Sequence, residues 1–414
     1  MKGSPLPCEL ALRKGGAAPG PLGGGARLGQ RHASGQQKGW NSMKIAILGY
    51  GTVGHGVDEI VAALDGVEVA HILDLPDRCT EPRMTSDYAS ILADPEVELV
   101  LECMGGLEPA HSFIMQALCA GKGVVTSNKA VVAAYFDEFA EAAKANGVSL
   151  FIEATTGGGI PWIASIEKAR RIDEVTSFMG IMNGTTNFIV DNMAKTGADF
   201  AETLARAQEL GYAEADPSAD IDGIDVKNKT IISASVCFDV ACTSDFPVTG
   251  IRNLTKADMD LFAAHGRVVK LLGHGVARDG SYAVAVEPMA LPASSLEANV
   301  PSNFNLVTLE GATIGELKFY GQGAGSLPTG NAMVQDVLDY RDGRRPSYDR
   351  SRDLAFDPAL LAGDYVFRTT EAPAGASPYG EGAWLVEGIT AEAARNLLTN
   401  ACEADPSAFM ARIV

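Results

Sequence analysis

The chain has 414 residues, of which 46% are apolar and 21% charged, a composition typical of a soluble globular protein with two or three domains. Its formal net charge is −19, and because residues 1–42 contribute about +5, the other 372 residues carry about −24. So acidic a body argues against nucleic acid as a main partner, since phosphates bind to a basic face. No apolar run approaches the ~20 residues of a membrane helix, so we expect no membrane partner.

The seven cysteines form no C-x-x-C pair, and the six histidines show no zinc-ligand spacing such as H-E-x-x-H. We therefore expect reduced thiols in a cytoplasmic protein and no zinc site.

Residues 1–42 are rich in Gly, Ala, Pro and basic residues and lack the apolar core of a secretory signal. Their composition predicts a disordered N-terminal extension. One interpretation is an upstream extension, with Met43 as the natural start of the fold. The alternative is a transit peptide, which the arginines allow but the glycines do not favour, and we prefer the first interpretation.

From Met43 onward, short β-rich runs alternate with helical stretches. Strands are predicted at 44–48, 67–73, 97–102, 123–126 and 148–153, and helices near 57–64, 109–120 and 129–146. Gly147 follows the longest helix in the position of a C-terminal cap. This alternation predicts an α/β fold with a parallel, doubly wound sheet.

After about residue 155 the pattern changes to that of a second, α+β domain. Asp199 is placed to cap a helix that ends before Gly211, with Glu202 in capping-box position. The other predicted elements are strands at 174–182, 282–286 and 317–320, helices at 223–238 and 331–340, and a glycine-rich loop at 321–330. Residues 341–414 fit a short α+β region, with strands at 365–369, 383–386 and 408–414 around a helix at 391–399.

The first motif with chemical meaning is Gly49-x-Gly51-x-x-Gly54, between a predicted strand and a predicted helix. Glycines there permit a tight turn and a close approach of a pyrophosphate to the backbone, while the helix N-terminus offers free N–H groups. Asp74 ends the second strand 20 residues after Gly54, where an acid accepts hydrogen bonds from the adenosine ribose. The context favours dinucleotide binding over a glycine turn without a ligand.

Lys129 follows Thr126-Ser127-Asn128 at a strand-to-helix junction, where a doubly wound sheet binds its ligands. A solvated lysine in a first helical turn is the alternative. Because a cation at that position opposes the helix dipole, we favour a functional role near nicotinamide and substrate.

The stretch from Glu153 to Pro161 ends a strand with three consecutive glycines, which expose backbone carbonyls and amides. Pro161 suits a first helical turn. A hinge between domains and a ligand or cation site explain this stretch equally well.

The most informative segment runs from Gly211 to Lys229, where several acids crowd a short Gly/Pro loop before a helix. Asp225 and Lys229 are four residues apart and share the helix face that carries Ile232, so this face is predicted to point inward. A buried pair of this kind is costly without a function, which favours a site over a solvated salt bridge. Clustered carboxylates suit a substrate ammonium group, and a desolvated lysine suits proton transfer at a carbonyl or hydroxyl.

Together these motifs resemble the homoserine dehydrogenase family over about 300 residues, from Met43 to Tyr340. The matching stretches, whose order and combination are specific, are 48–56, 102–108, 121–130, 153–161, 183–187, 211–229 and 321–329.

The resemblance implies NAD(P)-dependent hydride transfer that interconverts L-aspartate 4-semialdehyde and L-homoserine in threonine, methionine and isoleucine biosynthesis. It implies a Rossmann-type dinucleotide-binding domain at 43–155, completed by about 321–340, and a second domain at 156–320 for substrate binding and dimerisation. A homodimer would form through the sheet of that second domain.

The resemblance also implies the site residues. Lys229 would donate the proton to the carbonyl oxygen during reduction, with Lys129 on the other side of the reacting carbon. Glu214 and Asp225 would bind the substrate, supported by Asp220. The implied cofactor residues are Gly49, Gly51, Thr52, Val53, Gly54, Asp74, Gly105, Lys129 and Gly325, and backbone carbonyls of Glu153, Thr156, Gly158 and Ile160 would hold Na⁺ or K⁺.

Two departures from the family pattern bear on function. Leu73 stands where many members place an arginine that meets the 2′-phosphate of NADP, so we expect NAD preference or dual use, with Arg78 still within reach of a 2′-phosphate. Many bacterial relatives end in a regulatory ACT domain, of which 341–414 is a shortened or altered version at most. Threonine feedback is therefore doubtful.

Two rival interpretations are a related amino-acid dehydrogenase, such as an aspartate dehydrogenase, and a cofactor-binding protein that has lost catalysis. The segment 211–229 argues against the first, and the presence of Lys129, Asp225 and Lys229 argues against the second.

Overall fold

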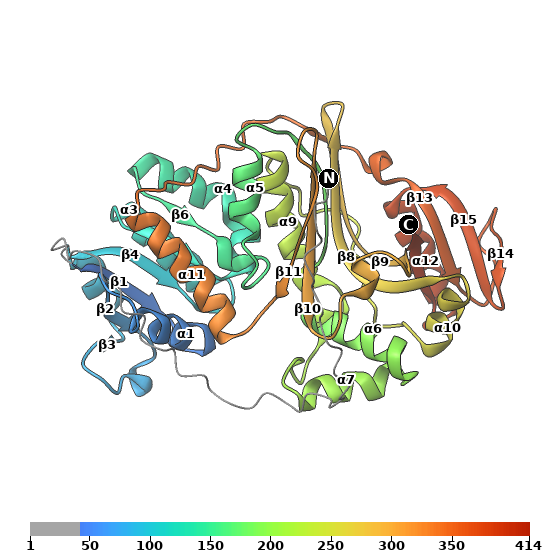
Figure 1. Ribbon diagram of the computed structural model, residues 1–414, viewed down its shortest axis with the longest axis horizontal. Helices are drawn as coiled ribbons and strands as arrows, with labels where there is room; N and C mark the ends of the chain where they lie inside the picture. Colours follow the sequence, from blue (N-terminus) through green and yellow to red (C-terminus); the bar gives the residue numbers. More distant parts are fainter. Residues whose placement is uncertain (1–41) are drawn as a thin grey trace, which may run out of the picture. The chain divides into compact units, whose positions relative to one another are not determined.

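The computed structural model describes residues 42–414, which are coloured in Figure 1. The disorder predicted for residues 1–42 lies outside the described residues, except for Ser42. Within the described part of the chain, no helix combines the length and the apolar character needed to cross a membrane.

The first sheet has six parallel strands in the order β3-β2-β1-β4-β5-β6. The order reverses between β1 and β4, and ligands of doubly wound sheets bind at the carboxyl ends of the strands next to such a switch. The strands are β1 (Met43–Leu48), β2 (Val67–Leu73), β3 (Met84–Thr85), β4 (Val97–Glu102), β5 (Gly123–Thr126) and β6 (Leu150–Phe151). The predicted parallel, doubly wound sheet is confirmed. Only β6 is much shorter than predicted, because the chain turns into a 3-10 helix at Glu153–Thr155.

Helices cover both faces of this sheet, since alternate residues of its buried strands point to opposite sides. Ile45 and Ile47 of β1 belong to the apolar core formed with α1 (Thr52–Val61) and α11 (Ser326–Arg341). Ala46 and Leu48 belong to the core formed with α3 (Ala110–Cys119) and α4 (Lys129–Asn146). Figure 1 shows α1 and α11 next to each other on their face of the sheet.

Two of these helices begin earlier than the sequence predicted. The predicted helix near 57–64 starts at Thr52, and the one predicted from residue 331 starts at Ser326. Glycines within the first five residues of each helix concealed both starts, because glycine is a poor helix former. They are needed for packing: a Cβ on Gly56 would lie 2.4 Å from the carbonyl oxygen of Ser326, and one on Gly330 would lie 2.8 Å from the carbonyl carbon of Gly56.

The second sheet has ten strands, in the order β11-β10-β7-β8-β9-β16-β13-β15-β14, with β12 paired to β9. Its first five strands are β7 (Val175–Ile181), β8 (Arg267–Arg278), β9 (Ser281–Pro292), β10 (Phe304–Gly311) and β11 (Gly315–Gln322). The sequence prediction missed β8 and β10 and shortened β9 and β11. Both missed strands are largely apolar and buried and lack the polar–apolar alternation that marks a half-buried strand.

Six helices pack with this sheet or connect its strands: α5 (Trp162–Ala169), α6 (Gly184–Thr196), α7 (Phe200–Glu209), α8 (Ser218–Ile221), α9 (Ile224–Phe238) and α10 (Lys256–Ala264). The predicted helices at α7 and α9 are confirmed. Asp199 caps α7 by accepting from the backbone N–H of Glu202.

The C-terminal region continues the second sheet. β16 (Phe409–Ile413) pairs with β9 in parallel and with β13 (Gly363–Arg368) in antiparallel fashion. β14 (Ser377–Gly380), β15 (Ala383–Ile389) and α12 (Ala391–Ala404) complete the region, while β12 (Ala355–Phe356) precedes it. The three strands and the helix predicted here are present, and β12 and β14 were not predicted.

Candidate active site

The substrate-binding and catalytic residues predicted from sequence meet at one cavity of about 820 Å³. Its walls come from loops at the carboxyl ends of β1, β5 and β6, from the start of α6, from α9, and from the segment between β11 and α11. Lys129, Glu214, Asp220, Asp225 and Lys229 all line this cavity. It lies at the end of the first sheet where a doubly wound fold binds its ligands.

Asp225 and Lys229 project from the first two turns of α9. The Lys229 Nζ donates to Asp225 Oδ2 at 2.7 Å and to the backbone carbonyl of Met182 at 2.6 Å. Each of the two side chains is only 9% exposed, so the pair is buried and is not a solvated surface bridge. Ile232, on the same helix face, is fully buried, as the spacing predicted.

The second carboxylate oxygen of Asp225, Oδ1, forms an ion pair with Lys129. Lys129 is the first residue of α4, where Asn128 caps the helix by accepting from the N–H of Val131. Its Nζ lies 3.0 Å from Asp225 Oδ1, and its side chain is 41% exposed towards the cavity. One carboxylate therefore bridges two ammonium groups from separate parts of the chain.

This arrangement shifts the pKa values of all three groups. Burial alone would raise the pKa of Asp225, but the charges of Lys229 and Lys129 overcome it and hold that pKa far below its usual range. Burial lowers the pKa of Lys229 despite its carboxylate partner. The charge of Asp225 raises the pKa of the more exposed Lys129. A lysine with a lowered pKa next to one that stays charged is suited to proton transfer beside a fixed positive charge.

Asn183 completes this polar network; it opens the matching stretch 183–187, but sequence reasoning assigned it no role in the site. It caps α6 by accepting from the N–H of Thr186 at 2.8 Å, and its Nδ2 donates to Asp220 Oδ1 at 2.6 Å and to Asp225 Oδ2 at 2.9 Å. Burial raises the pKa of Asp220. An Asn followed by Gly-Thr-Thr is an N-cap signal, and it could have located the start of α6 and this residue.

The glycine motif forms a tight turn between β1 and α1. A Cβ on Gly54 would lie 2.2 Å from the carbonyl oxygen of Gly49, whereas one on Gly51 would meet nothing within 4 Å. Within residues 42–414 no side chain caps α1, so the N–H groups of its first turn, including those of Thr52 and Val53, remain available to a ligand. This geometry fits a pyrophosphate at the helix N-terminus.

Asp74 lies directly after β2, beside this turn. Its carboxylate accepts from the backbone N–H groups of Tyr50 at 3.1 Å and Leu75 at 2.7 Å. The Arg78 guanidinium stands 3.9 Å away and is 63% exposed. Of the predicted cofactor residues, Thr52, Val53, Lys129 and Gly325 line the large cavity, whereas Gly49, Gly51, Gly54, Asp74 and Gly105 lie outside its lining.

Glu102, at the end of β4, is a buried acid that sequence reasoning passed over. It accepts from the hydroxyl of Thr126 at 2.5 Å and from the N–H of Met104 at 2.7 Å. Burial raises its pKa to about 7. It thereby connects the ends of β4 and β5, directly before the Gly105-Gly106 turn and the loop that leads to Lys129.

The stretch proposed to hold a cation crosses from the first sheet to α5. Gly158 lines the cavity, whereas Glu153, Thr156 and Ile160 do not. The side chain of Glu153 accepts from the N–H groups of Ile163 and Ala164 at the start of α5. The hydroxyl oxygen of Thr156 is buried and has no hydrogen-bond partner among the described residues, so an oxygen donor is available in this loop.

Comparison with known proteins gives the family. A family model described as homoserine dehydrogenase matches residues 161–338, and one described as the homoserine dehydrogenase NAD binding domain matches residues 49–153. A homoserine dehydrogenase of Synechocystis sp. is 41% identical over 322 residues, which cover 72% of this chain and 73% of the relative. The chain belongs to the homoserine dehydrogenase family.

Further homoserine dehydrogenases agree with this assignment. The one from Corynebacterium glutamicum is 39% identical over 319 residues and 72% of each chain. The crystal structure of the one from Thiobacillus denitrificans superposes with a TM-score of 0.81 at 29% identity and covers 90% of this chain and 98% of that one. As a member of this family, the chain is an oxidoreductase that acts on the CH–OH group of L-homoserine and forms L-aspartate 4-semialdehyde. The aspartate dehydrogenase interpretation is therefore dropped.

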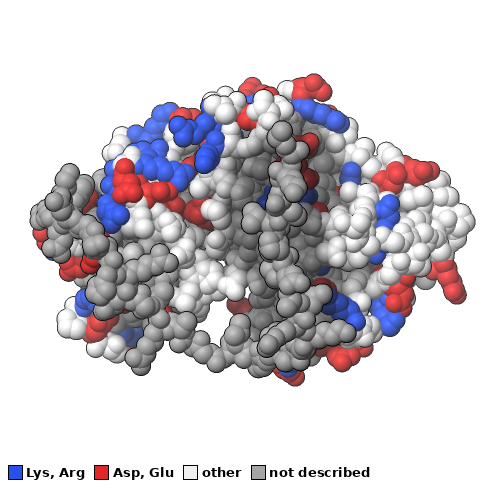
Figure 2. Space-filling view, in the orientation of Figure 1, with Lys and Arg blue, Asp and Glu red and all other residues white. Residues whose placement is uncertain are grey.

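A basic surface lies apart from the cavity that Lys129, Asp225 and Lys229 line. Figure 2 shows Lys and Arg side chains gathered at the upper left of the drawn face. A cleft of about 640 Å³ is lined by Lys168, Arg170, Arg171, Arg344 and Arg345, which follow the C-terminal halves of α5 and α11. Cations are favoured at helix C-termini, and Arg344 and Arg170 also pair with acids of the chain, so internal contacts account for much of this charge.

Proposed function

We propose that Lys229 and Lys129, bridged by Asp225, form the catalytic centre for oxidation of homoserine and reduction of the semialdehyde. The observation that carries the proposal is the single buried carboxylate that contacts both ammonium groups at the cavity wall. The bound nicotinamide would supply the hydride chemistry at the carbon that bears the hydroxyl.

Lys229 is the proton-transfer group in this proposal. Two of its three ammonium N–H groups are engaged by Met182 and Asp225, which leaves one for the substrate oxygen. In reduction, that N–H gives its proton to the carbonyl oxygen. In oxidation, the neutral amine takes the proton from the hydroxyl, and the lowered pKa of Lys229 makes the neutral amine accessible.

Lys129 has a different role, because its raised pKa keeps it charged. It stabilises the negative charge that develops on the substrate oxygen. Glu214, which is exposed on the cavity wall, and Asp225 would bind the substrate ammonium group, with Asp220 in support through Asn183.

The cofactor is NAD or NADP, held at the free N–H groups of Thr52 and Val53. The carboxylate of Asp74 suits the two ribose hydroxyls of NAD and repels a 2′-phosphate. The exposed Arg78 is near enough to compensate part of that repulsion. We therefore propose NAD preference or dual use, and note that a hyperthermophilic archaeal homoserine dehydrogenase of similar fold has been solved in complex with NADPH.

A monovalent cation, Na⁺ or K⁺, would bind at the carbonyls of Glu153, Thr156, Gly158 and Ile160. The buried, unpartnered hydroxyl of Thr156 supports an oxygen-rich site in this loop. The cation would hold the backbone of this loop, which leads from the first sheet to α5, in one conformation. The test is the activity and melting temperature in K⁺, Na⁺ and a bulky organic cation at constant ionic strength.

The assembly we propose is a homodimer formed through the second sheet. β11 ends the strand order of that sheet, and Tyr320 on this strand is 53% exposed. An exposed edge strand with a large aromatic side chain is suited to pairing with a second copy. Light scattering on the purified protein tests this proposal, and a monomer at micromolar concentration would contradict it.

The direct test of the mechanism uses cofactor reduction by L-homoserine in wild type, Lys229→Met and Lys129→Met. We expect Lys229→Met to lower kcat by about 10²–10⁴-fold while cofactor binding stays within twofold of wild type. Retained turnover in Lys229→Met would show that the proton comes from another group. Parallel assays with NAD and NADP test the preference, which a tenfold advantage of NADP in kcat/KM would refute.

A further inference from the structure

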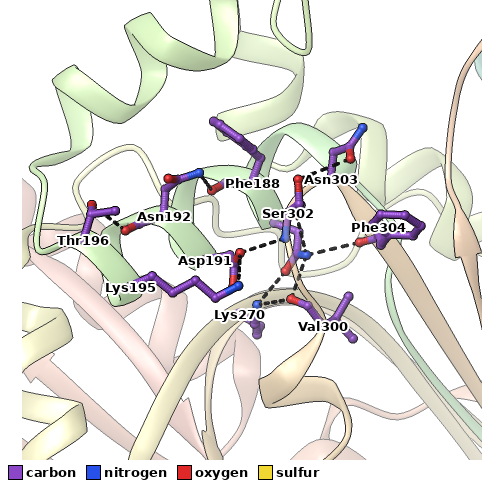
Figure 3. A network of polar contacts seen from close by, with 11 residues as sticks. Phe188, Asp191, Asn192, Lys195, Thr196, Lys270, Val300, Ser302, Asn303 and Phe304 are labelled. Carbon is purple, nitrogen blue, oxygen red and sulfur yellow. Dashed lines mark hydrogen bonds and ion pairs between the residues drawn. The ribbon is translucent and has the colours of Figure 1, made fainter. Parts of the chain in front are cut away.

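A lysine without an acidic partner lies in the interior, next to α6. Lys270, on β8, is fully buried and makes no ion pair among the described residues. Its Nζ donates to the side-chain oxygen of Asn187 at 2.8 Å. It also donates to the backbone carbonyl of Val300 at 2.9 Å (Figure 3). Burial lowers its pKa to about 8. A buried ammonium is expensive to desolvate, and an apolar side chain of similar length would avoid that cost.

The ammonium group fixes the orientation of the Asn187 amide. Because an ammonium only donates, Asn187 must turn its oxygen towards Lys270 and its NH₂ group away from it. That NH₂ group is surrounded by three backbone carbonyls, those of Val300 at 3.1 Å, Ser302 at 2.8 Å and Phe304 at 3.2 Å. If the amide were reversed, its oxygen would face these three carbonyl oxygens and repel them.

The loop held in this way, residues 300–304, has a constrained backbone. Ser302 has a φ of +52°, in the left-handed region that a serine rarely adopts. Its N–H donates to Asp191 of α6 at 2.8 Å, and Asp191 is also paired with Lys195. Figure 3 shows Ser302 of this loop in contact with Asp191 of α6, and Val300 in contact with Lys270. Such a conformation persists only where surrounding contacts determine it.

This loop forms part of the substrate cavity. Asn303 lines the cavity, and its carbonyl oxygen lies against Gly184, where a Cβ would approach it to 2.8 Å. Asn183, one helical turn before Asn187, donates to Asp220 and Asp225. The N-terminal end of α6 is therefore supported by Lys270, Asn187 and loop 300–304. That end of α6 carries Asn183, whose side-chain amide orients the carboxylates of Asp220 and Asp225.

We propose that Lys270 is a positioning residue for the substrate site, acting through Asn187 on loop 300–304 and on the start of α6. It sets the place of Asn183, and through Asn183 the carboxylates of Asp220 and Asp225, without touching substrate. The inference rests on the proposed substrate-binding role of these two carboxylates.

Two substitutions test the link. Lys270→Met removes the donor at nearly constant length. Asn187→Asp keeps a partner for Lys270 but removes the NH₂ group that holds the loop. We expect each to raise the KM for homoserine by about tenfold or more, because small misplacements in a site are costly, and to leave the KM for the cofactor within about twofold. Lys270→Gln, which retains an N–H donor, is expected to recover most of the KM increase.

The matched control is Asn192→Ala, on the same helix, since among the residues that the structure describes the Asn192 side chain donates only to the carbonyl of Phe188. It should leave both KM values within about twofold of wild type. An unchanged KM for homoserine in both Lys270→Met and Asn187→Asp, or an equal rise in both KM values, would overturn the proposal.

Hydrogen–deuterium exchange gives a readout that does not depend on activity. In Lys270→Met, amides of 184–187 and 300–304 should exchange faster, while those of the first sheet stay as in wild type. Unchanged exchange at both segments would refute the positioning role even if the wild type lacked homoserine-dependent activity. That lack of activity would refute the proposed function instead.

Discussion

Replacing Asp225 by asparagine tests whether the bridge between Lys129 and Lys229 behaves as a buried ion pair. The substitution preserves shape but removes the charge that both ammonium groups contact, at 3.0 Å and 2.7 Å. The two contacts differ in weight. Lys229 is 9% exposed, and breaking a buried pair costs about 3–5 kcal/mol, whereas the 41% exposed Lys129 contributes at most about 1 kcal/mol. We therefore expect a loss of roughly 3–5 kcal/mol in the free energy of unfolding, most of it from Lys229.

The pH dependence of this loss follows from the lowered pKa of Asp225. An acid whose pKa is lower in the folded than in the unfolded state stabilises the fold above its unfolded pKa of about 3.9. That stabilisation is lost as the pH falls through the folded pKa. The difference between wild type and Asp225→Asn should therefore be full at neutral pH and decline only below about pH 4.

Urea unfolding measures this difference, with Asp222→Asn as the matched control. Asp222 pairs with Arg252 at 2.6 Å just before the same helix, but the two side chains are 39% and 52% exposed. Asp222→Asn should therefore lower the free energy of unfolding by less than about 1 kcal/mol. Removing the Asp225 charge should also lower the pKa of Lys229 further and move the pH–rate profile to lower pH. Equal, small losses in both variants and an unmoved profile would refute the buried-pair reasoning.

Three further predictions concern other parts of the molecule. Gly54→Ala, whose Cβ would meet the carbonyl oxygen of Gly49 at 2.2 Å, should lower both the melting temperature and cofactor affinity, whereas Gly51→Ala should affect only cofactor affinity in a titration. Burial lowers the pKa of Lys270, beside Asp191 and Lys195, to about 8, so between about pH 8 and pH 10 the unfolded chain binds more protons than the folded one. Relative to Lys270→Met, the free energy of unfolding of the wild type in urea should therefore rise by about 3 kcal/mol as the pH rises through that window. A difference that stays constant with pH would contradict this prediction. Asp74→Ser should raise the NADP to NAD ratio of kcat/KM by about tenfold or more, and an unchanged ratio would show that Asp74 does not select the cofactor.

Local sequence patterns were sufficient for the first sheet and for one face of α9. The strands predicted at β1, β2, β4 and β5 agree with the structure because each is a short apolar run between turn residues, whereas the two-residue strand β3 was not predicted. The i,i+4 spacing of Asp225 and Lys229 on the Ile232 face predicted burial, which the structure bears out. The family resemblance, carried by motifs in a specific order, is confirmed by the comparisons.

The second sheet needed tertiary information. β8 and β10 are largely buried on both faces, so their sequences lack the alternation that would separate them from buried helical segments. Their pairing also joins segments far apart in the chain, as in the contact of β10 with β7 and of β16 with β9. Lys270 was invisible in sequence for the same reason, since its partners come from α6 and from loop 300–304.

Local sequence determined that acids crowd the loop before α9, but not which donors each of them contacts. Tertiary structure turns Asp222 towards Arg252 at the surface, and Asn183 draws Asp220 and Asp225 into the cavity. It also brings Lys129 from α4 to the same carboxylate. A carboxylate's partners depend on which distant donors the fold places within about 3 Å, and local spacing does not contain that distance.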